Sequence, residues 1–332
     1  MKSIVCNAFA PVETLMWKEI ENPSPGPGEV LVSLEAAAAN FPDALIVEGR
    51  YQLRPALPFT PGCEGCGEIL AIGVGVVGLD PGDRVMFSTP FGAFAEQVVV
   101  EASNVFRIDA DMPADDAAGF LLAYATAYHA LKQRGALKSG ETLLVLGAGG
   151  GVGLAAVELG RAMGARVVAA ASSAEKLLAC ADRGAEALIQ YDNPARLRAQ
   201  IAEATDGRGP DVVYDPVGGD MAEPAFRSIA YNGRYVVIGF AAGSIPSLPF
   251  NLPLLKSASI VGAIAGIFMV KEPDAHRQNV GELLDFYREG RLKPTIGARF
   301  ALEHAARAIR WLADRKAIGK IILDPRIDAI TQ

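Results

Sequence analysis

A dense run of glycines is the clearest candidate for chemistry in this 332-residue chain. Gly147-Ala-Gly-Gly-Gly-Val-Gly153 follows the apolar stretch Thr142–Leu146 and opens a helical pattern. Glycines permit a tight turn and let backbone N–H groups approach a pyrophosphate, while the helix N-terminus adds partial positive charge. This context predicts a dinucleotide site rather than a flexible loop without a ligand. The expected contacts are Gly147, Gly150, Gly151, Val152 and Gly153.

The end of the next predicted strand bears on which dinucleotide is bound. Sites that prefer NAD place a carboxylate here, where it binds the ribose 2′-hydroxyl. This chain instead has Ser172, with Lys176 on the first turn of the following helix and Tyr191 after the third strand. These three residues would accept a 2′-phosphate, although Glu175 beside Lys176 weakens the case. A charge-assisted hydrogen bond is worth about 1.5–3 kcal/mol, so NADPH is the expected cofactor.

Cysteine and histidine could bind a metal or carry redox chemistry. Cys63-Glu-Gly-Cys66 has the spacing of a zinc or redox pair, but the other two cysteines and the three histidines are scattered. We expect small buried thiols and no metal site. His129 lies in an apolar helical stretch and is expected to pack, whereas His276 and His304 are expected on helix surfaces.

Charge and hydropathy exclude some functions. The net charge of −7, without a basic run, argues against nucleic-acid binding. The most apolar stretch, residues 258–270, is too short for a membrane span. No signal peptide is evident, and four cysteines without one favour a reducing compartment, so a cytoplasmic location is expected.

Two patterns of secondary structure alternate along the chain. Residues 1–117 show short strands, such as 29–35 and 68–72, among turn formers, which is typical of a small barrel. Strand and helix signals then alternate to residue 266, which predicts an α/β fold with a doubly wound parallel sheet. The predicted strands are Thr142–Leu146, Arg166–Ala171, Ala187–Gln190, 211–214, 234–238 and 259–263, and the predicted helices include 152–163 and 174–183.

The tail returns to a different pattern. Helices are predicted near 275–288 and 302–315, followed by a strand at 320–323. We expect this tail to fold back onto the first region, so that 1–117 and 267–332 form one discontinuous domain around an inserted domain, 118–266.

The order of several motifs resembles the zinc-free quinone oxidoreductases, related to zeta-crystallin, of the medium-chain dehydrogenase/reductase superfamily. The motifs are Asn40-Phe-Pro-Asp43, Glu48-Gly-Arg-Tyr-Gln52, Leu57-Pro-Phe-Thr-Pro-Gly-Cys-Glu64, Gly82-Asp-Arg-Val85, Leu122-Ala-Tyr-Ala-Thr-Ala-Tyr-His-Ala-Leu131, Tyr214-Asp-Pro-Val-Gly-Gly219 and Gly233-Arg-Tyr-Val-Val-Ile-Gly239. The resemblance spans residues 1–324. It implies a GroES-like, β-rich catalytic domain and a Rossmann cofactor domain.

The resemblance also bears on zinc. The zinc alcohol dehydrogenases of this superfamily carry cysteine where this chain has Asn40, and histidine where it has Cys63. Their third ligand, another cysteine, falls near Leu122. A catalytic zinc needs about three protein ligands, so a zinc-independent reaction is expected.

By resemblance, Asn40 lies beside the nicotinamide ribose and substrate, and Tyr51 lines the substrate cleft, where it could donate a proton or hydrogen bond. Thr126 and Phe240 are expected to border the nicotinamide, and Asp43 is interpreted as structural. The family often has a second tyrosine where this chain has Leu45, which removes one polar donor.

The expected function is NADPH-dependent hydride transfer to a quinone. The alternatives are a reductase of α,β-unsaturated carbonyls such as enones and enals, and an NADPH-binding protein with little turnover. An apolar strand at the edge of the sheet, residues 259–263, and the family resemblance together favour a homodimer.

Overall fold

The computed structural model describes residues 1–191 and 193–327. The chain forms two compact units, the first made of Met1–Leu122 with Pro294–Gln332 and the second of Ala123–Lys293. The first unit is therefore discontinuous in sequence. Residues 267–293 belong to the second unit, whereas the division expected from sequence grouped them with the tail.

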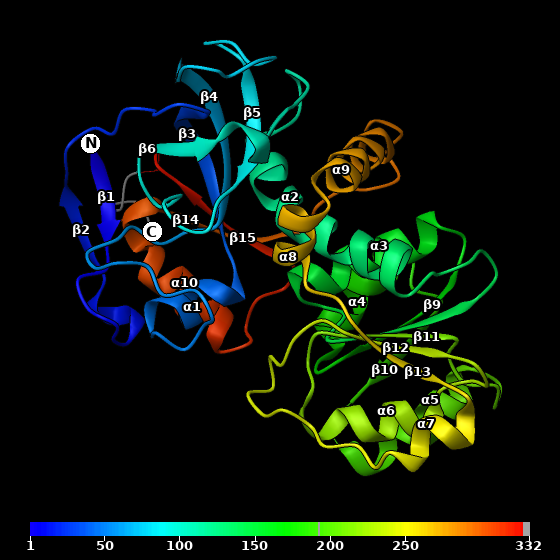
Figure 1. The fold of residues 1–332 in the computed structure, drawn as a ribbon. Coiled ribbons are helices and arrows are strands. Elements are labelled where there is room, and N and C mark those ends of the chain that lie inside the picture. Colours follow the sequence, from blue (N-terminus) through cyan, green and yellow to red (C-terminus); the bar gives the residue numbers. More distant parts are fainter. Residues whose placement is uncertain (192, 328–332) are drawn as a thin grey trace. The chain divides into compact units, whose positions relative to one another are not determined.

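The first unit is built on mostly antiparallel strands, and β14 and β15 form its one parallel pair in the described residues. A seven-stranded sheet has the order β14-β15-β3-β4-β5-β7, with β6 also paired to β3, and β1 pairs with β2 in a separate ribbon (Figure 1). The strands are β1 Lys2–Val5, β2 Met16–Glu19, β3 Glu29–Ala39, β4 Glu64–Ile72, β5 Arg84–Ser88, β6 Gln97–Glu101, β7 Val105–Arg107, β14 Ile296–Ala301 and β15 Lys320–Asp324. The pairing of β15 with β3 brings the tail into the sheet of the first region.

Burial along β3 follows its amino-acid pattern. From Glu29 to Glu35 alternate side chains are buried, as expected for a strand with one face on a core. The last four residues of β3 are all buried alanines. The core also receives Ala44 and Ile46 of α1 (Phe41–Val47) and apolar residues of α10 (Ala305–Ala313).

The second unit contains a six-stranded parallel sheet in the order β10-β9-β8-β11-β12-β13. Numbered along this unit, the order is 3-2-1-4-5-6, that of a Rossmann fold. Its strands are β8 Thr142–Leu146, β9 Arg166–Ala171, β10 Ala187–Gln190, β11 Val212–Asp215, β12 Arg234–Val237 and β13 Ser259–Gly262. The strands predicted from sequence are confirmed to within a residue at each end.

Helices connect the strands of this parallel sheet, and two more follow its last strand (Figure 1). They are α3 Gly151–Ala162, α4 Ala174–Asp182, α5 Pro194–Ala204, α6 Ala222–Ser228, α7 Asn251–Lys256, α8 Ala265–Lys271 and α9 Pro273–Arg288; α2 (Ala114–His129) precedes β8. Glycines with positive φ follow α3, α4 and α9, namely Gly164, Gly184 and Gly290. These are the left-handed conformations that end helices.

Two histidines enclose Phe268 of α8. The His129 ring stacks on Phe268 at 3.9 Å between centroids, and the ring of His276, on α9, meets it edge-on at 6.2 Å. The packing role predicted for His129 is confirmed. The surface position predicted for His276 is wrong, because this side chain is buried against a helix that the sequence pattern did not reveal.

Candidate functional site

The glycine turn joins β8 to α3 in the second unit. Gly147 has φ +59°, and Gly150 occupies the N-cap of α3. A Cβ on Gly153 would lie 2.3 Å from the carbonyl oxygen of Gly147. The helix therefore packs so closely on the turn that only glycine fits at position 153. A Cβ on Gly150 would lie 3.6 Å from that oxygen, an ordinary van der Waals contact, so this side of the turn is less crowded. The turn therefore has the cradle that a pyrophosphate needs, with first-turn N–H groups that lack partners within the helix.

Lys176 lies directly beside this turn. The Ser173 hydroxyl accepts a hydrogen bond from the Lys176 backbone N–H at 3.3 Å and so caps α4. The aliphatic stem of Lys176 crosses Gly149, where an added Cβ would lie 2.5 Å from the lysine Cβ. That Gly149 leaves room for this lysine could not be predicted from the local sequence.

Ser172 and Tyr191 follow neighbouring strands at the same edge of the sheet. Ser172 is exposed immediately after β9, and the Tyr191 backbone N–H donates to the Ala171 carbonyl at 3.1 Å. Ala148 of the glycine turn is tied to this edge as well, because its N–H donates to Ala170 at 3.0 Å. The structure thus gathers the predicted 2′-phosphate residues on the β9–β10 side of the turn.

The first unit contains a buried polar cluster around Glu64, at the start of β4. One carboxylate oxygen accepts from Lys320 Nζ at 2.7 Å and from Asn40 Nδ2 at 3.0 Å. The other accepts from the Leu122 backbone N–H at 2.8 Å. Antiparallel pairing of β15 with β3 places Lys320 near Asn40, the residue that follows β3. Lys320 was not predicted as a site residue, and nothing in its local sequence distinguishes it from a surface lysine.

The orientation of the Asn40 amide is fixed by this cluster. Its Nδ2 donates to the Ala38 carbonyl at 3.1 Å and to Glu64, while its Oδ1 accepts from Lys320 Nζ at 2.6 Å. A lysine ammonium only donates and a carboxylate only accepts, so the amide cannot be reversed. Both amide protons are engaged, so this amide has no proton left to donate to a ligand.

Asp43 and Cys63 form a second buried contact next to this cluster. The Asp43 carboxylate accepts from the Asn40 backbone N–H at 2.7 Å and from the Cys63 thiol at 3.1 Å. Burial raises the pKa of Asp43 to about 6, and burial together with Asp43 raises that of the Cys63 thiol. The thiol is therefore held protonated, while the interpretation of Asp43 as structural stays a prediction.

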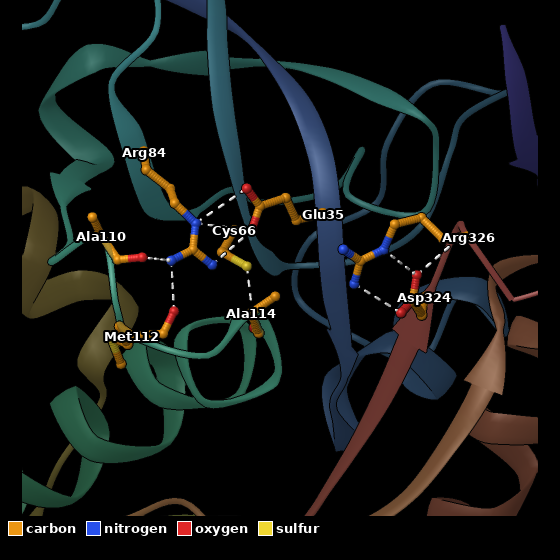
Figure 2. Close-up of polar contacts among 8 residues, drawn as sticks. All are labelled: Glu35, Cys66, Arg84, Ala110, Met112, Ala114, Asp324 and Arg326. Carbon is orange, nitrogen blue, oxygen red and sulfur yellow. Dashed lines mark hydrogen bonds and ion pairs between the residues drawn. The ribbon is translucent and has the colours of Figure 1, made fainter.

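Cys66 has different surroundings from Cys63. The Cys66 thiol donates to the Ala114 carbonyl at 3.1 Å, beside Arg84, whose guanidinium binds Glu35 at 2.7 Å (Figure 2). Arg84 also donates to two carbonyls, those of Ala110 and Met112, so the group anchors the segment that leads into α2. In the described part of the chain all four cysteines are free and buried, which confirms the expected buried thiols.

The remaining predicted site residues are divided between the units. Tyr51 is half-buried in the first unit, and burial raises its pKa, so its hydroxyl remains a donor at neutral pH. Thr126, on α2, and Phe240, after β12, belong to the second unit. The Phe240 ring touches Gly218, where an added Cβ would lie 2.7 Å from it.

Sheet order and glycine turn together define a Rossmann-type dinucleotide-binding protein. Two family models match, an alcohol dehydrogenase GroES-like domain over residues 26–110 and a zinc-binding dehydrogenase over residues 151–285. The quinone oxidoreductase-like protein 2 of Bos taurus is 37% identical over 298 residues, which are 90% of this chain and 85% of that protein.

Two solved structures extend the likeness over nearly the whole chain. A mycobacterial protein complexed with NADPH is 30% identical, with a TM-score of 0.92 over 98% of this chain and 100% of that one. The Escherichia coli quinone oxidoreductase complexed with NADPH is 26% identical, with a TM-score of 0.90 and the same coverage. The chain belongs to the quinone oxidoreductase family of the medium-chain dehydrogenase/reductase superfamily, with a GroES-like domain and a Rossmann domain.

Proposed function

We propose that this protein is a zinc-independent reductase that uses NADPH to reduce a quinone. The observation that carries the proposal is the glycine turn with Lys176 laid across Gly149 and Ser172 at the adjoining strand end. When bound there, NADPH supplies a hydride. The relatives named as quinone oxidoreductases support the choice of acceptor.

Several residues would hold the cofactor. Gly150, Gly151, Val152 and Gly153 present the start of α3 to the pyrophosphate. Ser172, Lys176 and Tyr191 surround the position of the 2′-phosphate at the β9–β10 side. A carboxylate at position 172 would repel that phosphate, and serine does not.

The donor set around Asn40 supports a reaction without zinc. Lys320 places an ammonium against both Asn40 and Glu64, so a divalent cation at this position would meet a like charge. The Cys63 thiol is held protonated by its bond to Asp43, whereas a metal needs a thiolate. In the described residues, no group of three or more histidine, cysteine or acidic side chains is placed to hold a metal ion.

Without zinc, the quinone would be polarised by hydrogen bonds from the protein. Tyr51 keeps its proton at neutral pH and is the proposed donor to a developing oxyanion. Asn40 has no unengaged amide proton, so its proposed role is to accept a hydrogen bond from a ribose hydroxyl.

The experiment is NADPH oxidation against quinones and α,β-unsaturated carbonyls, with metal content measured on the same sample. The proposal expects turnover with 1,4-naphthoquinone and with no stoichiometric zinc. Faster turnover of a simple 2-enal would favour the enone reductase instead, and tight NADPH binding without turnover would favour a binding protein.

We also propose a homodimer that pairs through β13 and acts in the cytoplasm. β13 ends the sheet, and Ile260 and Ile264 are about half exposed, at 47% and 50%. In residues 1–191 and 193–327, no helix is long and apolar enough to cross a membrane. Light scattering of the purified protein tests the dimer, and replacing Ile260 with Lys would be expected to yield monomers.

A further inference from the structure

Asp215, the last residue of β11, is a buried carboxylate that the proposed chemistry does not use. It is 2% exposed, and within residues 1–191 and 193–327 it forms no ion pair. One oxygen accepts from the backbone N–H groups of Val217 and Gly218, at 2.7 and 2.9 Å. The other accepts from the Tyr235 hydroxyl at 2.6 Å. Burying a charge without a cation is unfavourable, so its three donors indicate a specific structural task.

The hydrogen bonds of Asp215 hold the loop that follows β11. Gly218 and Gly219 both have positive φ, at +64° and +58°, and this turn is bonded to the loop after β12. The bonds run from Ala241 N–H to the Pro216 carbonyl at 3.0 Å and from Ala242 N–H to the Val217 carbonyl at 2.8 Å. We call residues 216–219 and 239–242 together the second wall.

The second wall borders the glycine turn. A Cβ on Gly147 would lie 2.7 Å from a methyl group of Val217, so the first glycine of the turn and this wall are in contact. β8 and β11 are neighbours in the sheet but are separated in sequence by β9 and β10. Their carboxyl ends form the point at which the strand order reverses, where dinucleotides cross Rossmann sheets.

The two halves of a dinucleotide must therefore lie on opposite sides of this point. Ser172, Lys176 and Tyr191 mark the β9–β10 side as that of the 2′-phosphate and adenosine. The remaining half extends over β11 and β12, against the second wall, where Phe240 packs on Gly218.

We propose that Asp215 and Tyr235 are positioning residues, which hold the second wall in the shape that receives the nicotinamide half of NADPH. This inference rests on the proposed function. The Asp215 carboxylate fixes the Val217 and Gly218 amides from within, and Tyr235, on β12, ties that carboxylate to the neighbouring strand. Neither residue is a catalytic group.

The chain contains a matched control. Tyr214, adjacent to Asp215, is 0% exposed, and within the described residues its hydroxyl has no hydrogen-bond partner. Tyr235→Phe and Tyr214→Phe each remove one buried hydroxyl from the same sheet. They differ in that only the Tyr235 hydroxyl donates a hydrogen bond to Asp215.

The experiment compares the affinities of NADPH and of 2′,5′-ADP, which lacks the nicotinamide nucleoside, by calorimetry on the full chain. Tyr235→Phe is expected to weaken NADPH binding about tenfold, the loss of one hydrogen bond to a charged group, and to leave 2′,5′-ADP within twofold. Tyr214→Phe should leave the affinities of both ligands unchanged. A general loosening of the fold would weaken both ligands alike, and that result would overturn the inference, as would unchanged NADPH binding.

A second variant tests the inference if Tyr235→Phe does not fold. Asp215→Asn keeps the size of the side chain but replaces one acceptor by a donor, and the same selective loss of NADPH affinity is expected. If the unaltered protein binds neither ligand, the proposed function fails. If it binds both and the variants match it, the positioning role alone fails.

Discussion

Lys320 and Glu64 form a buried ion pair across 256 residues of sequence, with 2.7 Å between Nζ and Oε1. Their side chains are 6% and 0% exposed. Both contact the Asn40 amide, so the pair fixes the orientation of that side chain.

Removing the ammonium should destabilise the protein strongly. Lys320→Met leaves Glu64 buried without its cation, which is expected to lower the free energy of unfolding by about 3–5 kcal/mol. Urea unfolding measures this loss. Lys316, whose exposed ammonium lies 3.0 Å from Asp314, provides the control, and Lys316→Met should change stability by less than about 1 kcal/mol. Equal effects of the two substitutions would show that the buried pair has no special role.

Cofactor preference should depend on Ser172 and Lys176. The double variant Ser172→Asp/Lys176→Ala is expected to raise the KM for NADPH about 10- to 150-fold, since one charge-assisted bond is lost and a repelling carboxylate is gained. The KM for NADH should change much less. Lys271→Ala, at an exposed position of the same unit, is the control. Steady-state kinetics measure the KM for each cofactor. Equal changes in the two KM values would refute the assignment of the 2′-phosphate site.

Two helical glycines should respond to alanine in opposite ways. Gly153→Ala places a Cβ 2.3 Å from the Gly147 carbonyl oxygen, so the turn must shift, and both stability and NADPH affinity should fall. Gly281, in α9, has no atom within 4 Å of an added Cβ. Gly281→Ala is therefore expected to stabilise the protein by about 0.5–1 kcal/mol without changing affinity. Thermal unfolding with and without NADPH measures both effects. Unchanged NADPH affinity in Gly153→Ala would contradict the assignment of this turn as the pyrophosphate site.

Stability should fall in mild acid because of His276. Burial lowers the pKa of His276 from 6.5 to about 4. Between these values the unfolded chain binds a proton that the folded protein does not, so stability is complete above pH 6.5 and declines as the pH falls towards 4. The contribution of this group could reach about 3 kcal/mol.

The test compares urea unfolding of the unaltered protein and of His276→Gln across this range. The variant should lose less stability on acidification, whereas His304→Gln, at a half-buried position, should follow the unaltered protein. Parallel curves for all three proteins would mean that the burial of His276 does not govern the acid response.

Sequence patterns predicted the Rossmann part well, because buried strands such as β8 and β9 are continuous apolar runs that end at glycine turns. Patterns could not predict contacts between distant segments. Phe268 buries His276 from a helix with no clear signature, and Lys320 reaches Glu64 through the pairing of β15 with β3. Asp215 and Tyr235 appeared in the family motifs, but their hydrogen bond depends on the register of β11 with β12.

The most direct test of a zinc-free reaction at this site is the rate of NADPH oxidation by 1,4-naphthoquinone, measured on protein freed of metal by a chelator and analysed for zinc. We expect turnover to persist without metal and to be lost when Gly153 is replaced. Turnover that disappears with the metal and returns with added zinc would contradict it.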